Sequence, residues 1–211
     1  HGSIHPGLCL VNPHRGGYND GIKLFPKGGF TGMAEHKLHL YTGNGKGKTT
    51  AAMGLALRAH GHGLPVLITQ FLKDGHSGEI TALSHLPGVT MMLPRPTHGF
   101  VFQMTEAEKA GVFALQTAHA HALCDYLRNP FHMQNGLLVL DELATALSLH
   151  MVEENTARML IDAALQRGEA VVSGYAAPPW LHAAADYVSV ITAEKHPYET
   201  EHLPAREGIE W

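Results

Sequence analysis

Residues 42–50, TGNGKGKTT, combine the residue types that bind phosphate groups. Glycines let the backbone curl so that its N–H groups point inward, and Lys48 followed by Thr49 matches the end of the P-loop pattern G-x-x-x-x-G-K-[ST]. In that pattern the lysine neutralises phosphate charge and the hydroxyl of the next residue binds Mg²⁺. Thr42 stands where the pattern has its first glycine, and Lys46 adds a second cation. We therefore predict a polyphosphate site that differs in detail from an ordinary P-loop.

Two carboxylates follow the apolar stretch GLLVLDE at 136–142. A carboxylate at the end of a buried strand beside a P-loop can bind Mg²⁺ directly or through water. Asp141 and Glu142, together with Thr49, are therefore the expected metal ligands. The alternatives are that Asp141 caps a helix and that Glu142 is a solvated acid in a first helical turn.

Strand-like and helix-like segments alternate from residue 36 onward. The hydrophobic patterns predict strands at 36–41, 65–71, 89–93, 136–142, 169–174 and 186–191. Helices are expected at 49–61, 80–86, 153–168, from Thr105 to about Arg128, and in a short piece after Pro178. Strands separated by helices predict an α/β fold with a mainly parallel sheet and helices on both faces.

Local signals mark several ends of these elements. Gly61 and Gly168 are expected to end the first and the fourth helix, and Thr105 with Glu108 reads as a capping box. The glycine loop, Lys73, the two carboxylates and residues 173–175 all follow strands. Since ligands of such folds bind at the carboxyl ends of the strands, we expect one shared site.

Composition excludes several classes of protein. The 211 residues carry a formal net charge of −4, so no basic field favours nucleic acid as a partner. No apolar run is long enough to span a bilayer, and no secretion signal is evident. The seventeen histidines are scattered without metal-ligand spacing, and none is nominated as catalytic. Cys9 and Cys124 are expected to be free thiols of a cytoplasmic protein.

Residues 1–32 differ in composition from the rest of the chain. They are dense in Gly, Pro and Asn and show no hydrophobic period, and Met33 follows directly. We expect this stretch to be an added leader or a loosely ordered arm. A single α/β domain is then expected over residues 33–211.

Several stretches resemble the P-loop class of ATP:corrinoid adenosyltransferases, the cob(I)alamin adenosyltransferases. They read YTGNGKGKTTAAMGLALRAHGHG, QFLKDG with a later Glu79, GF at 99–100, VLDEL, and KHPY with a later GIEW, and they extend from about residue 38 to the end. TGNGKGKTTAA followed by RAHGHG is the specific part, because a P-loop alone occurs in many protein classes. The resemblance implies a P-loop NTPase-like, RecA-like fold with three α/β/α layers.

The resemblance also implies an unusual reaction. In this family the reduced corrinoid, as Co(I), attacks the 5′ carbon of the ribose of ATP, and the whole triphosphate leaves. ATP lies in the loop in the reversed sense relative to ordinary P-loop ATPases. Lys48, Lys46 and Thr49 are then the catalytic residues, because fixed cations and dipoles stabilise the charge growing on the triphosphate. Co(I) is itself a strong nucleophile, so no general base is needed.

Further ATP-binding residues follow from the resemblance. Arg58, Gln70 and Lys73 match family positions near the nucleotide, although a solvated helix position is the alternative for Arg58. The loop itself is expected to bind ATP through Thr42, Gly43, Asn44, Gly45, Lys46, Gly47, Lys48, Thr49 and Thr50.

The resemblance places a second group of residues beside the corrinoid: Phe100, Phe102, Glu79, Lys195 and His196. The aromatic pair would wall the corrin ring and displace the lower axial ligand of cobalt, which makes Co(II) easier to reduce. Ordinary side-chain packing is the alternative for the two aromatics. The implied ligands are thus ATP, Mg²⁺ and cobalamin or a precursor corrinoid, and the implied partners are a flavoprotein reductase and a second copy of the chain.

Two departures from the family pattern stand out. Ser173, Gly174 and Tyr175 occupy the place of a T-G-R stretch, so a family arginine is missing, and a glycine expected after KHPY is absent. Two other functions therefore remain open. One is a P-loop ATPase or kinase, although neither a water-positioning residue nor an arginine finger is identified. The other is a non-catalytic protein that binds ATP and a corrinoid as a carrier or sensor.

Overall fold

The computed structural model describes residues 36–96, 99 and 101–210, so the predictions for residues 1–32 lie outside the described part. All described residues belong to one compact unit, Ala34–Trp211. The strands are β1 (Leu38–Thr42), β2 (Val66–Gln70), β3 (Val89–Met91), β4 (Gly136–Asp141), β5 (Gly168–Ser173) and β6 (Tyr187–Val190). The helices are α1 (Lys48–Gly61), α2 (Gly78–Ser84), α3 (Glu106–Arg128), α4 (Leu143–Ser148), α5 (Glu154–Leu165), α6 (Pro179–Ala184) and α7 (Pro197–Glu201), with a 3₁₀ turn at Val101–Gln103.

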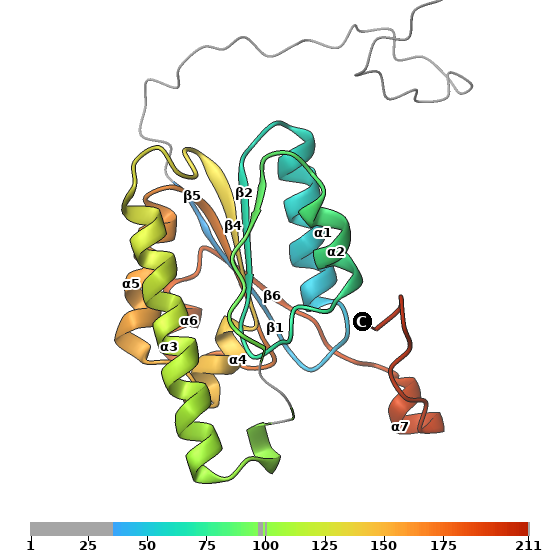
Figure 1. The fold of residues 1–211 in the computed structure, drawn as a ribbon. Helices are drawn as coiled ribbons and strands as arrows, with labels where there is room; N and C mark the ends of the chain where they lie inside the picture. Colours follow the sequence, from blue (N-terminus) through green and yellow to red (C-terminus); the bar gives the residue numbers. More distant parts are fainter. Residues whose placement is uncertain (1–35, 97–98, 100, 211) are drawn as a thin grey trace, which may run out of the picture. The chain divides into compact units, whose positions relative to one another are not determined.

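One sheet organises the fold. Its strands lie in the order β3-β2-β4-β5-β1-β6, and every pair of neighbours is parallel. Helices α1 and α2 lie on one face, and α3, α5 and α6 lie on the other (Figure 1). The predicted three-layer α/β fold is therefore confirmed. Because all strands run in the same direction, the loops that follow them gather at one edge of the sheet.

The central strands are buried on both faces, which explains their unbroken apolar sequence. In β4 the side chains of Leu138 and Leu140 belong to one core cluster, whereas those of Leu137 and Val139 belong to another on the opposite face. This alternation follows from the two-residue period of a strand. All six residues of β4 are buried, so the strand anchors both layers of helices to the sheet.

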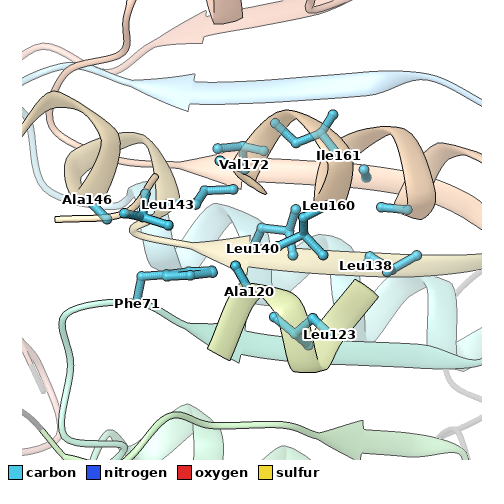
Figure 2. Close-up of a cluster of buried hydrophobic side chains, with 14 of the residues drawn as sticks. Phe71, Ala120, Leu123, Leu138, Leu140, Leu143, Ala146, Leu160, Ile161 and Val172 are labelled. Atoms are coloured by element: carbon cyan, nitrogen blue, oxygen red, sulfur yellow. The ribbon is translucent and has the colours of Figure 1, made fainter. Parts of the chain in front are cut away.

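The larger core cluster joins the sheet to α3, α4 and α5. Figure 2 shows Leu138 and Leu140 beside Ala120 and Leu123 of α3 and beside Leu160 of α5. All five side chains are fully buried. Each fully buried leucine contributes roughly 1.5–3 kcal/mol relative to an exposed one, so this cluster holds the strand ends, and the loops after them, in place.

Two helix ends differ from the sequence prediction. Gly61 is the last residue of α1, and the residue with the left-handed conformation after the cap is Gly63, with φ +79°. Helix α5 ends at Leu165, and Gly168 begins β5. A Cβ on Gly168 would lie 2.0 Å from the carbonyl oxygen of Gly136, so this glycine permits close strand approach and does not end a helix.

The capping-box prediction is confirmed. Thr105 accepts a hydrogen bond from the N–H of Glu108 at 3.3 Å, and the Glu108 carboxylate accepts one from the N–H of Thr105 at 2.7 Å. Cys124 is a buried free thiol, as expected, and Cys9 lies outside the described residues. None of the helices in the described part of the chain combines the length and apolar character that a membrane crossing requires.

Two short helices were not predicted. Helix α4 follows β4 almost without a connection, and α7 lies in the C-terminal stretch that the sequence indicated as loop-rich. Glu142 makes the turn from β4 into α4 with φ +61°, a left-handed conformation that a carboxylate residue adopts less readily than glycine does. An apolar run that continues from strand into helix hides this turn from a pattern-based prediction.

Candidate active site

A cavity of about 850 Å³ opens where β1, β2 and β4 end. Its wall includes residues 45–50 of the glycine loop, residues 72–74 and 76–79 of the loop after β2 and the start of α2, and Glu142 after β4. Residues 208–210 of the C-terminal segment line it too. The prediction that loops at the strand ends share one site is therefore consistent with the structure.

The first half of the glycine loop is bound to neighbouring backbone. Thr42 Oγ1 donates to the carbonyl oxygen of Tyr175 at 3.4 Å, and the N–H of Gly43 donates to the same oxygen at 3.2 Å. The N–H of Gly45 donates to the carbonyl oxygen of Ile191 at 2.8 Å. A Cβ on Gly43 would lie 2.3 Å from that Ile191 oxygen. These residues hold the loop against the segments after β5 and β6.

Only part of the predicted ATP-binding loop lines the cavity. Thr42, Gly43 and Asn44 are not among the lining residues. The Asn44 side chain instead accepts a hydrogen bond from the N–H of Ala193 at 3.2 Å. The hydroxyl of Thr42 gives a structural reason for the unusual first residue of the motif, because glycine could not make its side-chain contact with the backbone of Tyr175.

The second half of the loop faces the cavity. Gly47, with φ +117°, precedes Lys48, the first residue of α1, and the first turn of this helix has no acidic residue. The positive end of the helix dipole is thus left for an anionic ligand. Lys48 Nζ donates to the carbonyl oxygen of Gly45 at 2.9 Å. Burial lowers the pKa of Lys48, and the carboxylates of Glu142 and Asp141 oppose this effect.

Asp141 is the centre of a hydrogen-bond network beneath the loop. Its carboxylate is fully buried and accepts hydrogen bonds from Thr49 Oγ1 at 2.9 Å, Gln70 Nε2 at 2.9 Å and Lys73 Nζ at 2.7 Å. The hydroxyl of Ser173 donates to it as well. Four side chains from four different segments therefore converge on one carboxylate, as a preformed binding site requires.

The backbone at the ends of β2 and β4 positions the side chains that meet at Asp141. Gln70 lies beside Asp141 in the pairing of β2 with β4, so both side chains end at the same edge. Leu72 and Glu142 follow with φ +56° and +61°. Left-handed conformations at residues other than glycine carry strain and concentrate at functional sites. Lys73 follows Leu72 directly, and its Nζ donates a hydrogen bond to the Asp141 carboxylate.

The alternatives considered for the two carboxylates are not what the structure shows. Asp141 is the last residue of β4 and caps no helix, because the residue that precedes α4 is Glu142. Glu142 lines the cavity and accepts a hydrogen bond from Thr145 Oγ1 at 2.5 Å. Its N–H donates to Ser173 Oγ at 3.0 Å. Both carboxylates are thus held by neighbouring groups.

The oxygen atoms around Asp141 fit the preferences of Mg²⁺. Thr49 and Asp141 present hard oxygen atoms, and Gln70 Oε1 is buried without a hydrogen-bond partner among the described residues. The described part of the chain contains no group of three or more His, Cys, Asp or Glu side chains that could enclose a metal. Mg²⁺ usually binds through one or two carboxylates together with phosphates and water, so this sparse ligand set suits it.

The residues predicted to contact a corrinoid are dispersed. Glu79 lines the cavity in the first turn of α2. Phe102 is 78% exposed and lies outside the cavity lining. Lys195 is exposed, and His196 precedes α7, where its ring accepts a hydrogen bond from the N–H of Tyr198 at 3.2 Å. Phe100 lies outside the described residues.

Arg58 also lies away from the cavity. It is exposed near the end of α1, whereas the cavity is lined by the start of that helix. Its positive charge lowers the pKa of Tyr41, although burial of this tyrosine has the larger, opposite effect. The role of Arg58 in binding ATP stays a prediction.

Two site residues were missed or interpreted differently from sequence. Ser173 was noted only as part of a departure from a T-G-R stretch, yet its hydroxyl contacts Asp141. Glu210 lines the cavity and accepts a hydrogen bond from Lys46 Nζ at 3.0 Å. Hydrogen bonds from Arg206 and then from Lys46 lower the pKa of Glu210 to about 2. The GIEW ending, noted as part of the resemblance, was the available signal for Glu210.

Comparisons with known proteins identify the family of the chain. Residues 34–211 match the family described as ATP:corrinoid adenosyltransferase BtuR/CobO/CobP. The chain is 31% identical over 175 residues to the corrinoid adenosyltransferase of Pseudomonas aeruginosa, with 82% of this chain and 83% of that protein covered. It is 28% identical over 172 residues to the corrinoid adenosyltransferase CobA of Salmonella typhimurium, with 82% and 84% covered.

A shorter match concerns one segment only. Over 34 residues, 16% of the chain, the identity to the corrinoid adenosyltransferase of Escherichia coli is 65%. The resemblance inferred from the glycine loop and its companion motifs is therefore confirmed. Since the family match extends over most of the chain and over the whole described fold, the chain belongs to the ATP:corrinoid adenosyltransferase family.

Proposed function

We propose that this chain transfers the 5′-deoxyadenosyl group of ATP to the Co(I) centre of cobalamin or a precursor corrinoid and releases triphosphate. The observation that carries the proposal is the cavity at the glycine loop, which Lys46, Lys48 and Lys73 all line. The chain also belongs to the family that carries out this reaction. A bond forms between cobalt and the 5′ carbon of the ribose. The bond from that carbon to the triphosphate oxygen breaks, and the electron pair leaves with the triphosphate.

The site residues stabilise the leaving group in this proposal. Lys48 and the N–H groups at the start of α1 face the negative charge that grows on the triphosphate as the carbon–oxygen bond breaks. Bound Mg²⁺ would be held by Thr49, Asp141 and Glu142 and would neutralise further charge. Lys46 reaches the same ligand once it separates from Glu210. No proton has to be abstracted, because Co(I) is the nucleophile.

ATP hydrolysis is the second candidate, and Glu142 favours it. A carboxylate that lines the cavity next to the proposed metal ligand Asp141 could orient a water molecule toward phosphorus. In adenosyl transfer Glu142 needs no such role. The two reactions differ in the atom attacked, so their products separate them.

One anaerobic assay distinguishes the candidates. ATP, Mg²⁺ and chemically reduced cobalamin are mixed with the protein while the absorption spectrum is followed and phosphate products are quantified. Adenosyl transfer yields the cobalt–carbon product with stoichiometric triphosphate. Release of orthophosphate without a corrinoid would support hydrolysis, and binding of both ligands without any product would support a carrier or sensor.

Several further assignments complete the proposal. A flavoprotein reductase would supply Co(I) from Co(II), and the chain would act in the cytoplasm as a homodimer. Phe100 and Phe102 would lie against the corrin ring with Lys195, His196 and Glu79 around it.

Residues 33–211 would be the functional domain, and residues 1–32 a leader or an arm. Removal of residues 1–32 should therefore leave adenosyl transfer unchanged in the same assay.

A further inference from the structure

The ammonium group of Lys73 lies between two of the three proposed metal ligands, Thr49 and Asp141. Its Nζ donates to Thr49 Oγ1 at 2.9 Å and to Asp141 Oδ2 at 2.7 Å. The two ligands also contact each other, since Thr49 Oγ1 donates to Asp141 Oδ1 at 2.9 Å. One cation therefore already bonds to the same oxygens that Mg²⁺ would use.

Burial explains why a cation is needed there. Asp141 is fully buried, and a buried carboxylate is costly unless a partner neutralises it. Among the ion pairs of the described residues, Asp141 has Lys73 as its partner. Lys48, the other nearby lysine, bonds to the Gly45 carbonyl oxygen. Lys73 keeps 30% of its side chain exposed, so it reaches Asp141 from the cavity side and has room to leave.

We propose that the Lys73 ammonium occupies the magnesium position of the nucleotide-free protein and excludes the metal until a triphosphate arrives. The inference rests on the proposed function, because it concerns the metal site of that reaction. Mg²⁺ binds oxygen at about 2.0–2.1 Å in a tight octahedron, so it cannot share Thr49 and Asp141 with an ammonium group. When the metal enters, Lys73 turns from Asp141 to the phosphate oxygens in the cavity.

Charge explains why the exchange depends on triphosphate. A metal ion alone would displace the Lys73 ammonium from Asp141 and leave it without a new anionic partner, because Lys46 already pairs with Glu210 and no phosphate is present. A triphosphate supplies negative charge for the metal and for the displaced ammonium at once. By linkage, metal and triphosphate must then raise each other's affinity by the same factor, and such coupling is typically about 5- to 150-fold.

The test measures metal binding without nucleotide. Mn²⁺ replaces Mg²⁺ as a probe, and free Mn²⁺ is quantified by electron paramagnetic resonance in titrations of wild-type, Lys73→Met and Lys73→Gln proteins. Removal of the competing ammonium should lower the Kd for Mn²⁺ by about tenfold or more. The glutamine variant retains a donor for Asp141, so it remains informative if the methionine variant fails to fold.

Matched variants identify the site and exclude a general charge effect. Lys46 lines the same cavity but pairs with Glu210, so Lys46→Met removes an equal charge without freeing the metal ligands. It should change the Kd for Mn²⁺ much less than Lys73→Gln does. Asp141→Asn combined with Lys73→Gln should abolish the gain, because it removes the carboxylate ligand.

The affinity for Mg·ATP should change in the opposite direction to the affinity for Mn²⁺. If Lys73 moves to the phosphates, Lys73→Gln should weaken Mg·ATP binding although it tightens Mn²⁺ binding. Weaker binding of both Mn²⁺ and Mg·ATP by Lys73→Gln would mean that Lys73 only supports the structure. An equal gain in Mn²⁺ affinity in Lys46→Met would mean a general charge effect. Either result overturns the proposal. Because Mn²⁺ titration needs no turnover, it still decides the question if the wild-type protein fails to transfer an adenosyl group.

Discussion

The nucleotide half and the corrinoid half of the proposed site differ in how their residues are held. Side chains from the start of α1, the ends of β2 and β5 and the loop after β2 all donate to the Asp141 carboxylate, which is fully buried. On the other side, Phe102 is 78% exposed, and Lys195 and His196 lie in a C-terminal segment that is largely exposed. One half is assembled without a ligand, whereas the other presents side chains to solvent.

The difference has a physical reason. Buried polar groups must satisfy one another, so a buried carboxylate forces its neighbours into a single arrangement even when no ligand is bound. Exposed aromatic and charged side chains lose no hydrogen bonds to water and are subject to no such requirement. We therefore expect the nucleotide half to bind ATP with little rearrangement and the corrinoid half to rearrange more when its large substrate binds.

The largest expected effect concerns the nucleotide half. Lys48→Ala removes the lysine at the start of α1 that is proposed to stabilise the departing triphosphate. Turnover with pre-formed Co(I) should fall by roughly 10²–10³-fold or more, as for loss of a donor to a developing negative charge. Circular dichroism of the variant serves as the control for folding. Normal activity in a folded Lys48→Ala protein would contradict the assigned role.

The next effect tests how firmly the core beneath that half is held. Burial lowers the pKa of His119 to about 4, and its ring lies 2.7 Å from Thr69 Oγ1 and edge-on to Phe71. Since the ordinary value is 6.5, the unfolded chain takes up the proton first as the pH falls. The contribution of His119 to stability is complete above about pH 6.5 and is lost progressively down to about pH 4, at most roughly 3 kcal/mol.

Denaturant titrations of wild type and His119→Gln at several pH values isolate this contribution from those of the other histidines. The wild type should lose more unfolding free energy than the variant between about pH 6.5 and pH 4. Parallel curves for the two proteins would show that His119 titrates in the folded state as it does in the unfolded chain.

A smaller effect is expected on the corrinoid half. Phe102→Ala should change the free energy of unfolding by less than about 0.5 kcal/mol, because the ring is largely exposed. Reaction from Co(II) with a flavin-type reductant should slow by about 3- to 10-fold, which corresponds to loss of one aromatic contact. Reaction from pre-formed Co(I) should slow less. Equal losses in the two assays would mean that the ring does not act on the reduction step.

The smallest effect connects the two halves through the C-terminal segment. Glu210→Gln removes the carboxylate that pairs with Lys46 and Arg206, so it should free Lys46 for phosphate. The Kd for inorganic tripolyphosphate, measured by calorimetry, should fall severalfold. Glu207→Gln removes an equal charge from the same segment and is the matched control. Weaker tripolyphosphate binding in Glu210→Gln would show that Glu210 positions Lys46 and does not compete for it.

The sequence by itself determined the polyphosphate loop, the alternation of strands and helices, and the capped start of α3. These features rest on short-range patterns: the spacing of glycines and lysines, the unbroken apolar runs of buried strands, and a capping box within four residues. Asp141 was a candidate for the same reason, because it ends such a run.

Tertiary structure decided the contacts between segments far apart in the sequence. Only the packed fold shows that Thr42 binds the backbone of Tyr175, that Gly168 serves strand approach, and that Glu210 pairs with Lys46. The same holds for Lys73, which follows the left-handed residue Leu72 and donates a hydrogen bond to Asp141 at the end of the neighbouring strand β4. Such contacts depend on register and on the path of the backbone, and residue types at fixed spacing do not encode either one locally.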